Sequence, residues 1–255
     1  MGFERATDWV PLPKKIQEMG SITDRIDQLD WESIREELHD KGFAVVKKVL
    51  FKNECHRLIE EYNMDAHYRK TIDMQRYRFG SGEYKYFSYP LPEIITQLRE
   101  SVYPAIAPVA NQWMSELDLA TRFPENHKEM IKLCREQGQT KPTALILKYG
   151  EGGFNTLHQD LYGEIFFPMQ MVFVLNQAGE DHTGGEFVIT EQVPRAQCKI
   201  NVLVPGVGDM LIFTTRFRPV KGTKGYYRVN MKHGVSPLHS GNRFSLGVIF
   251  HDGLS

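Results

Sequence analysis

The stretch HGVSPLHSGNRFSLGVIF, at residues 233–250, indicates the fold of this chain more clearly than any other. Its middle, residues 237–242, is rich in Pro, Gly, Ser and Asn, which are typical of turns. Its end is apolar and β-prone, so we predict two successive strands that this turn joins. His233 then ends the first strand, and Arg243 begins the second, with Ser245 on the same strand face.

The second half of the chain contains further short β-prone runs, most of them separated by Gly, Pro, Asn or Asp. Many short strands without intervening helices predict an antiparallel sandwich or jelly roll. The predicted strands span residues 144–149, 169–175, 186–190, 200–204, 210–214, 226–231 and 244–250.

The first half is predicted to be mainly helical. Trp31, Ile34 and Leu38 have the three- and four-residue spacing of one helix face, and Gly42 ends that helix before a short strand at 43–46. Further helices are predicted from an Asn53 N-cap, from Pro92, with a kink or break at Pro104 and Pro108, and from near Pro124 to near Gly138.

Helices that precede strands predict the α+β fold class, with the helices packed on one face of the sheet. We find no repeat, linker or low-complexity tract that divides the chain. We therefore expect one integrated domain, in which a helical support region at residues 1–138 packs on a jelly-roll core at residues 139–255.

The composition is that of a soluble globular protein. Hydrophobic residues make up 41% and charged residues 25% of the 255 residues, which argues against a disordered, collagen-like or membrane-spanning chain. Three distant cysteines, Cys55, Cys134 and Cys198, argue against a disulfide framework and for a reducing cytoplasm. The first 15 residues lack the apolar core of a signal peptide.

The charge is unevenly distributed along the chain. There are 31 Lys and Arg against 32 Asp and Glu, whereas a nucleic-acid-binding domain usually has a pI above about 9. Residues 210–250, however, contain seven basic and no acidic residues, and the remaining 24 basic and 32 acidic residues give −8. This basic tract predicts an anionic substrate near His233, with a solvated basic loop as the alternative.

His158 and Asp160 are two residues apart, so on a strand both side chains would point to one side. Alone, they also fit a surface or turn pair. With His233 they form the two-histidine, one-carboxylate set of non-heme Fe(II) oxygenases, which leaves metal positions open for a co-substrate and O2. The planar fork of Arg243 suits a carboxylate, so we expect a dicarboxylate co-substrate that chelates iron at its other end.

These motifs, in their order over residues 143–251, resemble the Fe(II)/2-oxoglutarate-dependent dioxygenase superfamily, in its prolyl-4-hydroxylase-like branch. The ending HGVSPLHSGNRFSLGVIFHD is most similar to a prokaryotic oxygenase group proposed to act on damaged, alkylated nucleic acid. The matching motifs are Tyr149-Gly150-x-Gly152-Gly153, His158-x-Asp160, Gly184-Gly185-Glu186, Gly208-Asp209-x-Leu211-x-Phe213, His233-x-Val235-Ser236-Pro237 and Arg243-x-Ser245.

The resemblance implies a double-stranded β-helix catalytic core that couples oxidative decarboxylation of 2-oxoglutarate to C–H hydroxylation. Its cofactors would be Fe(II), 2-oxoglutarate and O2, with ascorbate as a reductant. Collagen-type prolyl hydroxylases have Lys at the position of Arg243, which argues against a collagen-type substrate. The implied residues are His158, Asp160 and His233 for the metal, and Arg243, Ser245, Tyr149 and Gln170 for 2-oxoglutarate.

The primary substrate is left open. Oxidative demethylation of alkylated nucleic acid fits the resemblance and the basic tract, whereas hydroxylation of a peptide, amino acid or small metabolite fits the near-neutral charge. A non-catalytic jelly-roll binding protein is an alternative of another class. Residues 76–87 interleave aromatics and bases, as in a nucleic-acid surface, a Gly-hinged lid or a β-hairpin. The candidate substrate residues are Arg78, Tyr84, Tyr86, Arg228 and His251, the last with packing as its alternative.

Overall fold

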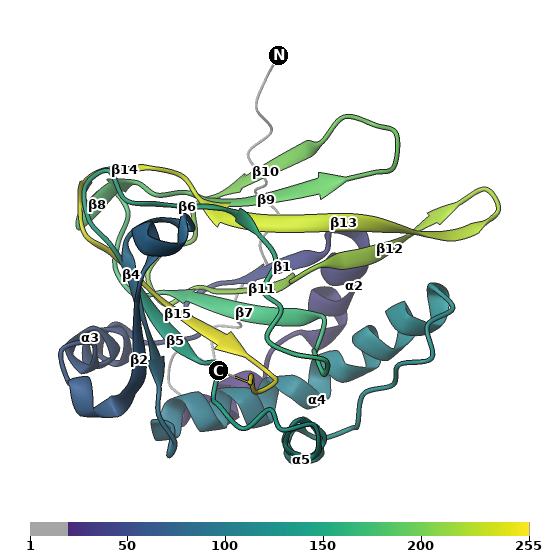
Figure 1. Cartoon of the computed structure of the whole chain (residues 1–255), viewed down its shortest axis with the longest axis horizontal. Coiled ribbons are helices and arrows are strands. Elements are labelled where there is room, and N and C mark those ends of the chain that lie inside the picture. Colours follow the sequence, from purple (N-terminus) through teal and green to yellow (C-terminus); the bar gives the residue numbers. More distant parts are fainter. Residues whose placement is uncertain (1–19, 255) are drawn as a thin grey trace.

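The structure is a computed structural model that describes residues 20–254. Two antiparallel sheets face each other, and helices cover the outer side of the larger one (Figure 1). The larger sheet has the order β1 (Phe43–Val46), β11 (Met210–Thr214), β7 (Met169–Val174), β15 (Arg243–Ile249), β5 (Leu145–Tyr149), β4 (Glu83–Phe87) and β2 (Tyr68–Asp73). The smaller has the order β10 (Lys199–Leu203), β9 (Phe187–Gln192), β13 (Gly225–Val235), β6 (Phe154–His158) and β3 (Gly80–Ser81).

Three further strands and the helices complete the fold. β12 (Phe217–Gly222) pairs with β13 in a hairpin that extends beyond the sheets, and β8 (His182–Gly184) pairs with β14 (Leu238–Gly241) (Figure 1). The helices are α1 (Ile22–Asp27), α2 (Trp31–Lys41), α3 (Lys52–Glu61), α4 (Glu93–Glu116) and α5 (His127–Glu136), with the 3₁₀ turns η2 (Asp65–His67) and η3 (Met74–Tyr77). Within residues 20–254, the helices are all too short or too polar to cross a membrane.

The central strands of the larger sheet bury both of their faces. In β7, Met171 and Phe173 pack in the core under the helices, whereas Val172 packs in the core between the two sheets. Successive strand side chains point to opposite faces, so one strand supports the helical layer and lines the interior. Gln170 is a polar residue on that interior face, where it lines the cavity described in the next section.

The long helix α4 differs from the prediction, because neither Pro104 nor Pro108 interrupts it. The two prolines are four residues apart, and both are exposed on the solvent side of the helix. Water can therefore satisfy the carbonyls that lose a partner, while Val102, Ile106 and Trp113 stay buried on the other side. Burial of this apolar face outweighs the missing hydrogen bonds.

Two predicted helix starts move by a few residues. The N-cap of α3 is Phe51 rather than Asn53, because the Glu54 carboxylate accepts a hydrogen bond from the Phe51 amide at 2.7 Å. α5 begins after Asn126, whose side chain accepts from the Glu129 amide at 3.0 Å, and so starts later than Pro124. In both places a side chain that satisfies a free amide sets the boundary.

The first half of the chain is not purely helical support. β1, β2 and β4 belong to the larger sheet and β3 to the smaller, so strands from both halves build the sandwich. β6, β8, β12 and β14 also fall outside the predicted strands, and β14 forms within residues 237–242, which were predicted to be a turn, because it pairs with β8. β1 coincides with the strand predicted at 43–46. The other first-half strands, β2, β3 and β4, are short and partly polar, and they are recognised by their partners in the sheet rather than by their own pattern. Residues 1–19 of the predicted support lie outside the described residues.

Candidate active site

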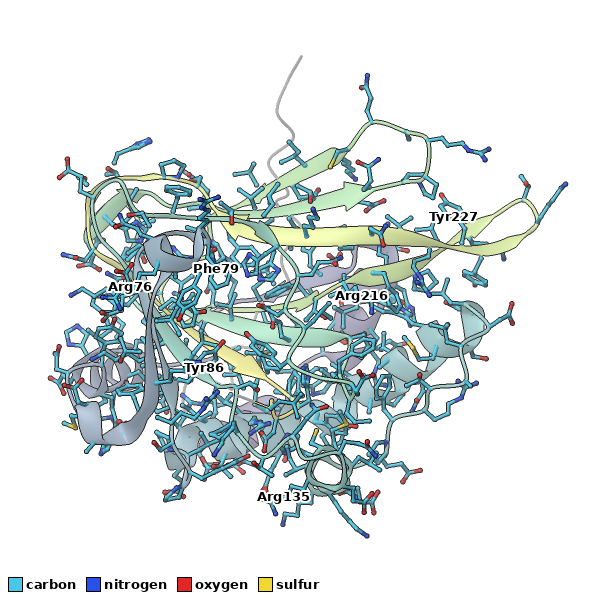
Figure 2. All side chains as sticks on the ribbon, viewed as in Figure 1. Arg76, Phe79, Tyr86, Arg135, Arg216 and Tyr227 are labelled. Carbon is cyan, nitrogen blue, oxygen red and sulfur yellow. The ribbon has the colours of Figure 1, made fainter. Side chains whose placement is uncertain are left out.

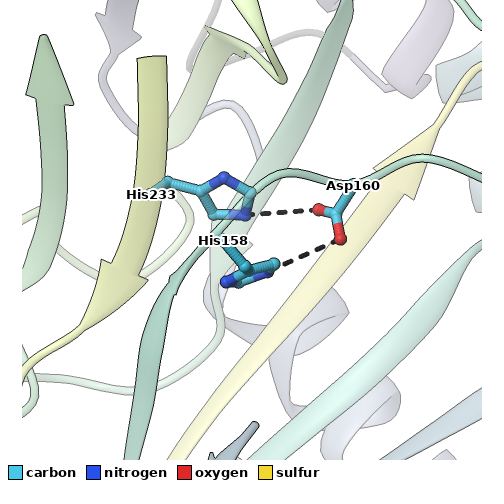
Figure 3. Close-up of side chains that lie close together, drawn as sticks. All are labelled: His158, Asp160 and His233. Carbon is cyan, nitrogen blue, oxygen red and sulfur yellow. Dashed lines mark ion pairs between the residues drawn. The ribbon is translucent and has the colours of Figure 1, made fainter. Parts of the chain in front are cut away.

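The three predicted metal ligands come together between the two sheets. His158 ends β6 and pairs in register with His233 on β13, and Asp160 lies in the loop just after β6 (Figure 3). Nε2 of His233 is 3.2 Å from Oδ2 of Asp160, and Nε2 of His158 is 3.5 Å from Oδ1. These three side chains each offer one ligand atom, and the atoms all lie within 4.8 Å of one another.

Hydrogen bonds and charge prepare these groups to bind a cation. Nδ1 of His158 donates to the Thr156 carbonyl at 2.8 Å, which orients the ring so that Nε2 faces Asp160. Burial would raise the pKa of Asp160, but hydrogen bonds from the two histidines and their attraction hold it well below its usual value. Burial and the neighbouring His158 lower the pKa of His233. Burial would lower the pKa of His158, but its hydrogen bond to Asp160 raises it. The site therefore presents an ionised carboxylate and, at His233, a neutral imidazole.

Gln170 and Tyr162 hold the Asp160 carboxylate in place. Nε2 of Gln170 donates to Oδ2 at 2.7 Å, and the Tyr162 hydroxyl lies 3.3 Å from Oδ1. Oε1 of Gln170 is buried and has no hydrogen-bond partner among the described residues. Gln170 thus contacts a predicted metal ligand as well as the cavity in which the co-substrate is expected.

Arg243 lies on the interior face of β15, opposite Tyr149 on β5. It is 2% exposed, and its Nη1 donates to the Ser245 hydroxyl at 3.1 Å. Burial lowers its pKa, yet it pairs with no carboxylate among residues 20–254. A buried guanidinium without an acidic partner is costly unless an anion binds it, so this geometry suits a ligand carboxylate.

The Gly184-Gly185-Glu186 motif makes room for this arginine. A Cβ on Gly185 would lie 2.9 Å from Cδ of Arg243 and 2.5 Å from Cδ1 of Leu238. The φ of Gly185 is also +72°, a conformation that other residues rarely adopt. A side chain at residue 185 would therefore displace the Arg243 guanidinium from its position beside Ser245.

A cavity of about 390 Å³ joins the two groups of residues. Tyr84 and Tyr86, two of the candidate substrate residues, line this cavity from β4. The lining also includes Lys70, Tyr77, Phe79 and Tyr162, which the sequence analysis did not name as candidate site residues. Tyr77 and Phe79 lie in the mixed aromatic and basic tract at residues 76–87.

The other three candidate substrate residues do not line the cavity. Arg78 is exposed beside it, and Arg228 lies on the β12–β13 hairpin, with its guanidinium 4.5 Å from the centre of the Phe217 ring. His251 is buried, and its Nδ1 accepts the Phe167 amide at 3.1 Å. Burial lowers the His251 pKa to about 3, so its surroundings are those of a packed core group.

The basic tract is distributed differently from the prediction. Arg243 enters the cavity, and Arg218 is buried in an ion pair of 3.0 Å with Glu191, so two of the seven charges lie inside the protein. Arg216 is partly exposed at the base of the β12–β13 hairpin (Figure 2). The remaining four are exposed: Lys221, Lys224 and Arg228 on that hairpin, and Lys232 where β13 pairs with β9, next to His233. Most of the free charge lies along a projecting arm rather than around the metal ligands.

Comparison with known proteins identifies the family of this chain. A family model described as "Oxygenase, catalysing oxidative methylation of damaged DNA" matches residues 82–253. The chain belongs to this oxygenase family. The match confirms the predicted resemblance and the prediction of an oxygenase enzyme. An uncharacterized protein of Mycobacterium tuberculosis strain H37Rv is 32% identical to the oxygenase over 239 residues, 94% of this chain and 97% of that protein.

Solved structures confirm the jelly-roll fold of the oxygenase. A Pseudomonas putida prolyl-4-hydroxylase has a TM-score of 0.50 at 15% identity, covering 85% of this chain and 96% of that chain. A Trichoplax adhaerens prolyl hydroxylase, in complex with a peptide fragment of the hypoxia inducible factor oxygen degradation domain, has a TM-score of 0.54 at 16% identity, with coverages of 85% and 86%. Within this fold, His158, Asp160 and His233 form a cluster that could hold a metal ion.

Proposed function

We propose that this oxygenase uses Fe(II), 2-oxoglutarate and O2 to hydroxylate a C–H bond of an alkylated nucleic acid base. One observation carries the reaction class: two histidines and a carboxylate converge at one end of a cavity whose other end holds a buried arginine without an acidic partner. A cavity that contains both metal ligands and an anion-binding arginine fits a dicarboxylate that contacts both.

The metal would be held by Nε2 of His158, Nε2 of His233 and one oxygen of Asp160. These donors fit Fe(II), because two imidazoles and a carboxylate bind it on one face and leave the remaining positions open. When bound, the iron supplies the redox chemistry with O2 that breaks a C–H bond. Gln170 and Tyr162 would keep the carboxylate oriented through their hydrogen bonds to its oxygens.

The binding site for 2-oxoglutarate would be formed by Arg243 and Ser245, with the buried Tyr149 beside them. The guanidinium can donate two parallel hydrogen bonds to the distal carboxylate in a water-poor environment, which makes each bond stronger than at the surface. Burial raises the Tyr149 pKa to about 12, so its hydroxyl stays protonated and can donate a hydrogen bond. Asn155 lies 3.4 Å from this hydroxyl and orients it.

An alkylated nucleic acid is supported as the primary substrate by the family description and by the cavity lining. Within the described residues, Asp160 is the single acidic residue of that lining, and aromatic rings form much of the rest. Oxygen from O2 would enter an N-methyl C–H bond, 2-oxoglutarate would become succinate and CO2, and the N-hydroxymethyl product would lose formaldehyde. The net result would be removal of the methyl group.

A cytoplasmic location and stimulation by ascorbate remain predictions. Cys55, Cys134 and Cys198 are all free thiols, as a reducing compartment would allow. Hydroxylation of a peptide, amino acid or small metabolite remains the alternative for the same reaction class.

The test loads the protein anaerobically with Fe(II) and 2-oxoglutarate, adds O2, and measures succinate and formaldehyde with N-methylated oligonucleotides. We expect both products from the wild type, and neither from His158→Ala, which should also lose Fe(II) binding. Hydroxylated product without formaldehyde from a peptide or metabolite would favour the alternative substrate class. Unchanged Fe(II) binding by His158→Ala, with no turnover of any substrate by the wild type, would overturn the oxygenase mechanism.

A further inference from the structure

Two aromatic rings form a stacked pair at the edge of the cavity. The Tyr77 and Phe79 ring centres are 5.5 Å apart, and the ring planes differ by 18°. Tyr77 is 54% exposed and Phe79 is 46% exposed, yet both line the cavity that holds the predicted metal ligands. Large apolar rings in solvent cost free energy unless a partner covers them, so this pair marks a contact surface.

The pair is fixed to the strand that ends at His158. The Phe79 carbonyl accepts hydrogen bonds from the amide and the hydroxyl of Thr156, at 2.8 and 2.7 Å. Gly80 pairs with Asn155, and a Cβ on Gly80 would lie 2.1 Å from the Phe154 carbonyl oxygen, so glycine permits this close packing. The rings are therefore held at a set position relative to the metal ligands, which favours a rigid platform over a hinged lid.

Positive charge surrounds this ring pair. Arg76 and Arg78 flank Tyr77 in the sequence, and both are exposed; Arg76 has one carboxylate nearby, with its Nε 3.8 Å from Oδ2 of Asp73. Lys70 lines the same cavity. Figure 2 shows Arg76, Phe79 and Tyr86 on one side of the molecule, away from Arg216 and Tyr227 on the β12–β13 arm. Flat rings beside cations suit a ligand that is itself flat and anionic.

We propose that the Tyr77–Phe79 pair is a stacking platform for a nucleobase next to the alkylated one, and this rests on the proposed nucleic-acid substrate. The reacting base must enter the cavity, whereas these half-exposed rings lie at its edge, where the neighbouring base remains. Arg76 and Arg78 would contact the phosphates on either side of that base. A peptide would bind less tightly to these rings and arginines, because few of its side chains present a flat face with a phosphate beside it.

The experiment uses single-stranded DNA 9-mers with one N-methylated adenine, bound anaerobically to the protein with Fe(II) and 2-oxoglutarate. Two further probes carry an abasic site immediately 5′ or 3′ to the methylated base. Fluorescence anisotropy measures the Kd of each probe for the wild type, for Tyr77→Ala/Phe79→Ala and for the ring-retaining control Tyr77→Phe/Phe79→Tyr. Melting temperatures check that the variants are folded.

We expect the alanine variant to bind the intact probe about 10- to 100-fold more weakly, because each stacked base contributes about 1–3 kcal/mol. One of the two abasic probes should bind the wild type similarly weakly, and the alanine variant should not distinguish it from the intact probe. The ring-retaining control should bind like the wild type.

Two results would overturn the platform in distinguishable ways. If the wild type does not bind the intact probe, or if only a peptide stimulates succinate formation, the nucleic-acid substrate fails and the platform fails with it. If the wild type binds all three probes equally, or if the alanine variant keeps wild-type affinity, the substrate proposal stands and the platform alone is wrong. The comparison of abasic probes needs only the wild type, so it holds even if a variant does not fold.

Discussion

Two buried arginines on opposite sides of the larger sheet have opposite surroundings. Arg99, on the helical side, is 1% exposed, and its guanidinium contacts the buried Asp252 at 3.0 Å and the Tyr89 hydroxyl at 3.2 Å. Arg243, on the cavity side, is 2% exposed, and among the described residues its one hydrogen-bond partner is the Ser245 hydroxyl.

The difference separates a charge that the fold neutralises from one that we propose binds a ligand. A buried charge is tolerated when a partner within the protein compensates it, as Asp252 does for Arg99. Arg243 has no such partner among the described residues, so its desolvation lowers the stability of the folded protein. Residues that lower stability in this way are typical of binding sites, where the ligand completes the interaction.

The largest effect is expected for Arg243→Met, which keeps much of the volume and removes the charge. Loss of two charge-assisted hydrogen bonds should weaken 2-oxoglutarate binding about 100-fold or more, measured as the KM for succinate formation. The melting temperature without 2-oxoglutarate should stay equal or rise, because an unpaired buried charge is gone. A large loss of stability would contradict the contrast with Arg99.

Arg99→Met should behave in the opposite way. It leaves the Asp252 carboxylate buried without its cation, which should lower the free energy of unfolding by about 3–5 kcal/mol. Urea unfolding measures this, and the KM for 2-oxoglutarate of the remaining folded protein should not change. The double variant Arg99→Met/Asp252→Leu is the control, and it should recover much of the loss, since no unpaired charge remains.

The exposed arm tests a third kind of charge, one that neither the fold nor the cavity uses. Lys221→Gln/Lys224→Gln/Arg228→Gln should raise the KM for an N-methylated oligonucleotide and leave kcat unchanged. The slope of log affinity against log salt should fall by about 2, since each single-strand phosphate contact contributes about 0.7.

A matched control for the arm lies on α5, which Figure 2 shows below the sheets at Arg135. Lys128→Gln/Lys132→Gln/Arg135→Gln removes three exposed positive charges of the helical layer. An equal change of the salt slope in both triple variants would mean that net charge, rather than the arm, attracts the substrate.

The smallest effect concerns His251, which is buried behind the site as a neutral group. Its folded pKa is about 3 and the unfolded value is about 6.5, so below pH 6.5 the unfolded chain binds a proton that the folded chain does not. Stability is therefore complete above pH 6.5 and falls toward pH 3, by about 1.4 kcal/mol per pH unit.

His251→Asn should reduce this dependence by one proton, because Asn can still accept the Phe167 amide. Urea unfolding between pH 6 and 4.5 measures the difference in slope between the variant and the wild type. His127, whose pKa burial lowers to about 2, is present in both proteins and cancels in the comparison. Equal slopes would show that His251 takes up a proton in the folded protein.

The site was predictable where its chemistry is tied to short spacings. His158 and Asp160 are two residues apart, and Arg243 and Ser245 share a strand face. The turn predicted at residues 237–242 was wrong, because residues 238–241 pair with β8 as strand β14. The substrate side was not predictable in the same way. Arg228 belongs to the same basic tract as Arg243, yet it lies on the projecting arm, because β12 and β13 pair with each other beyond the edge of the sandwich.

Local sequence patterns were sufficient to predict the jelly-roll class and to single out His158, Asp160, His233 and Arg243, which line one cavity, because the period of a strand and the donor chemistry of His, Asp and Arg are local properties. Three features depended on the tertiary structure: the strands that the first half adds to both sheets, the burial of His251, and the meeting of Tyr77 and Phe79 with the cavity. Each depends on which distant segment packs alongside, and pairing in a sheet joins residues that no local pattern connects.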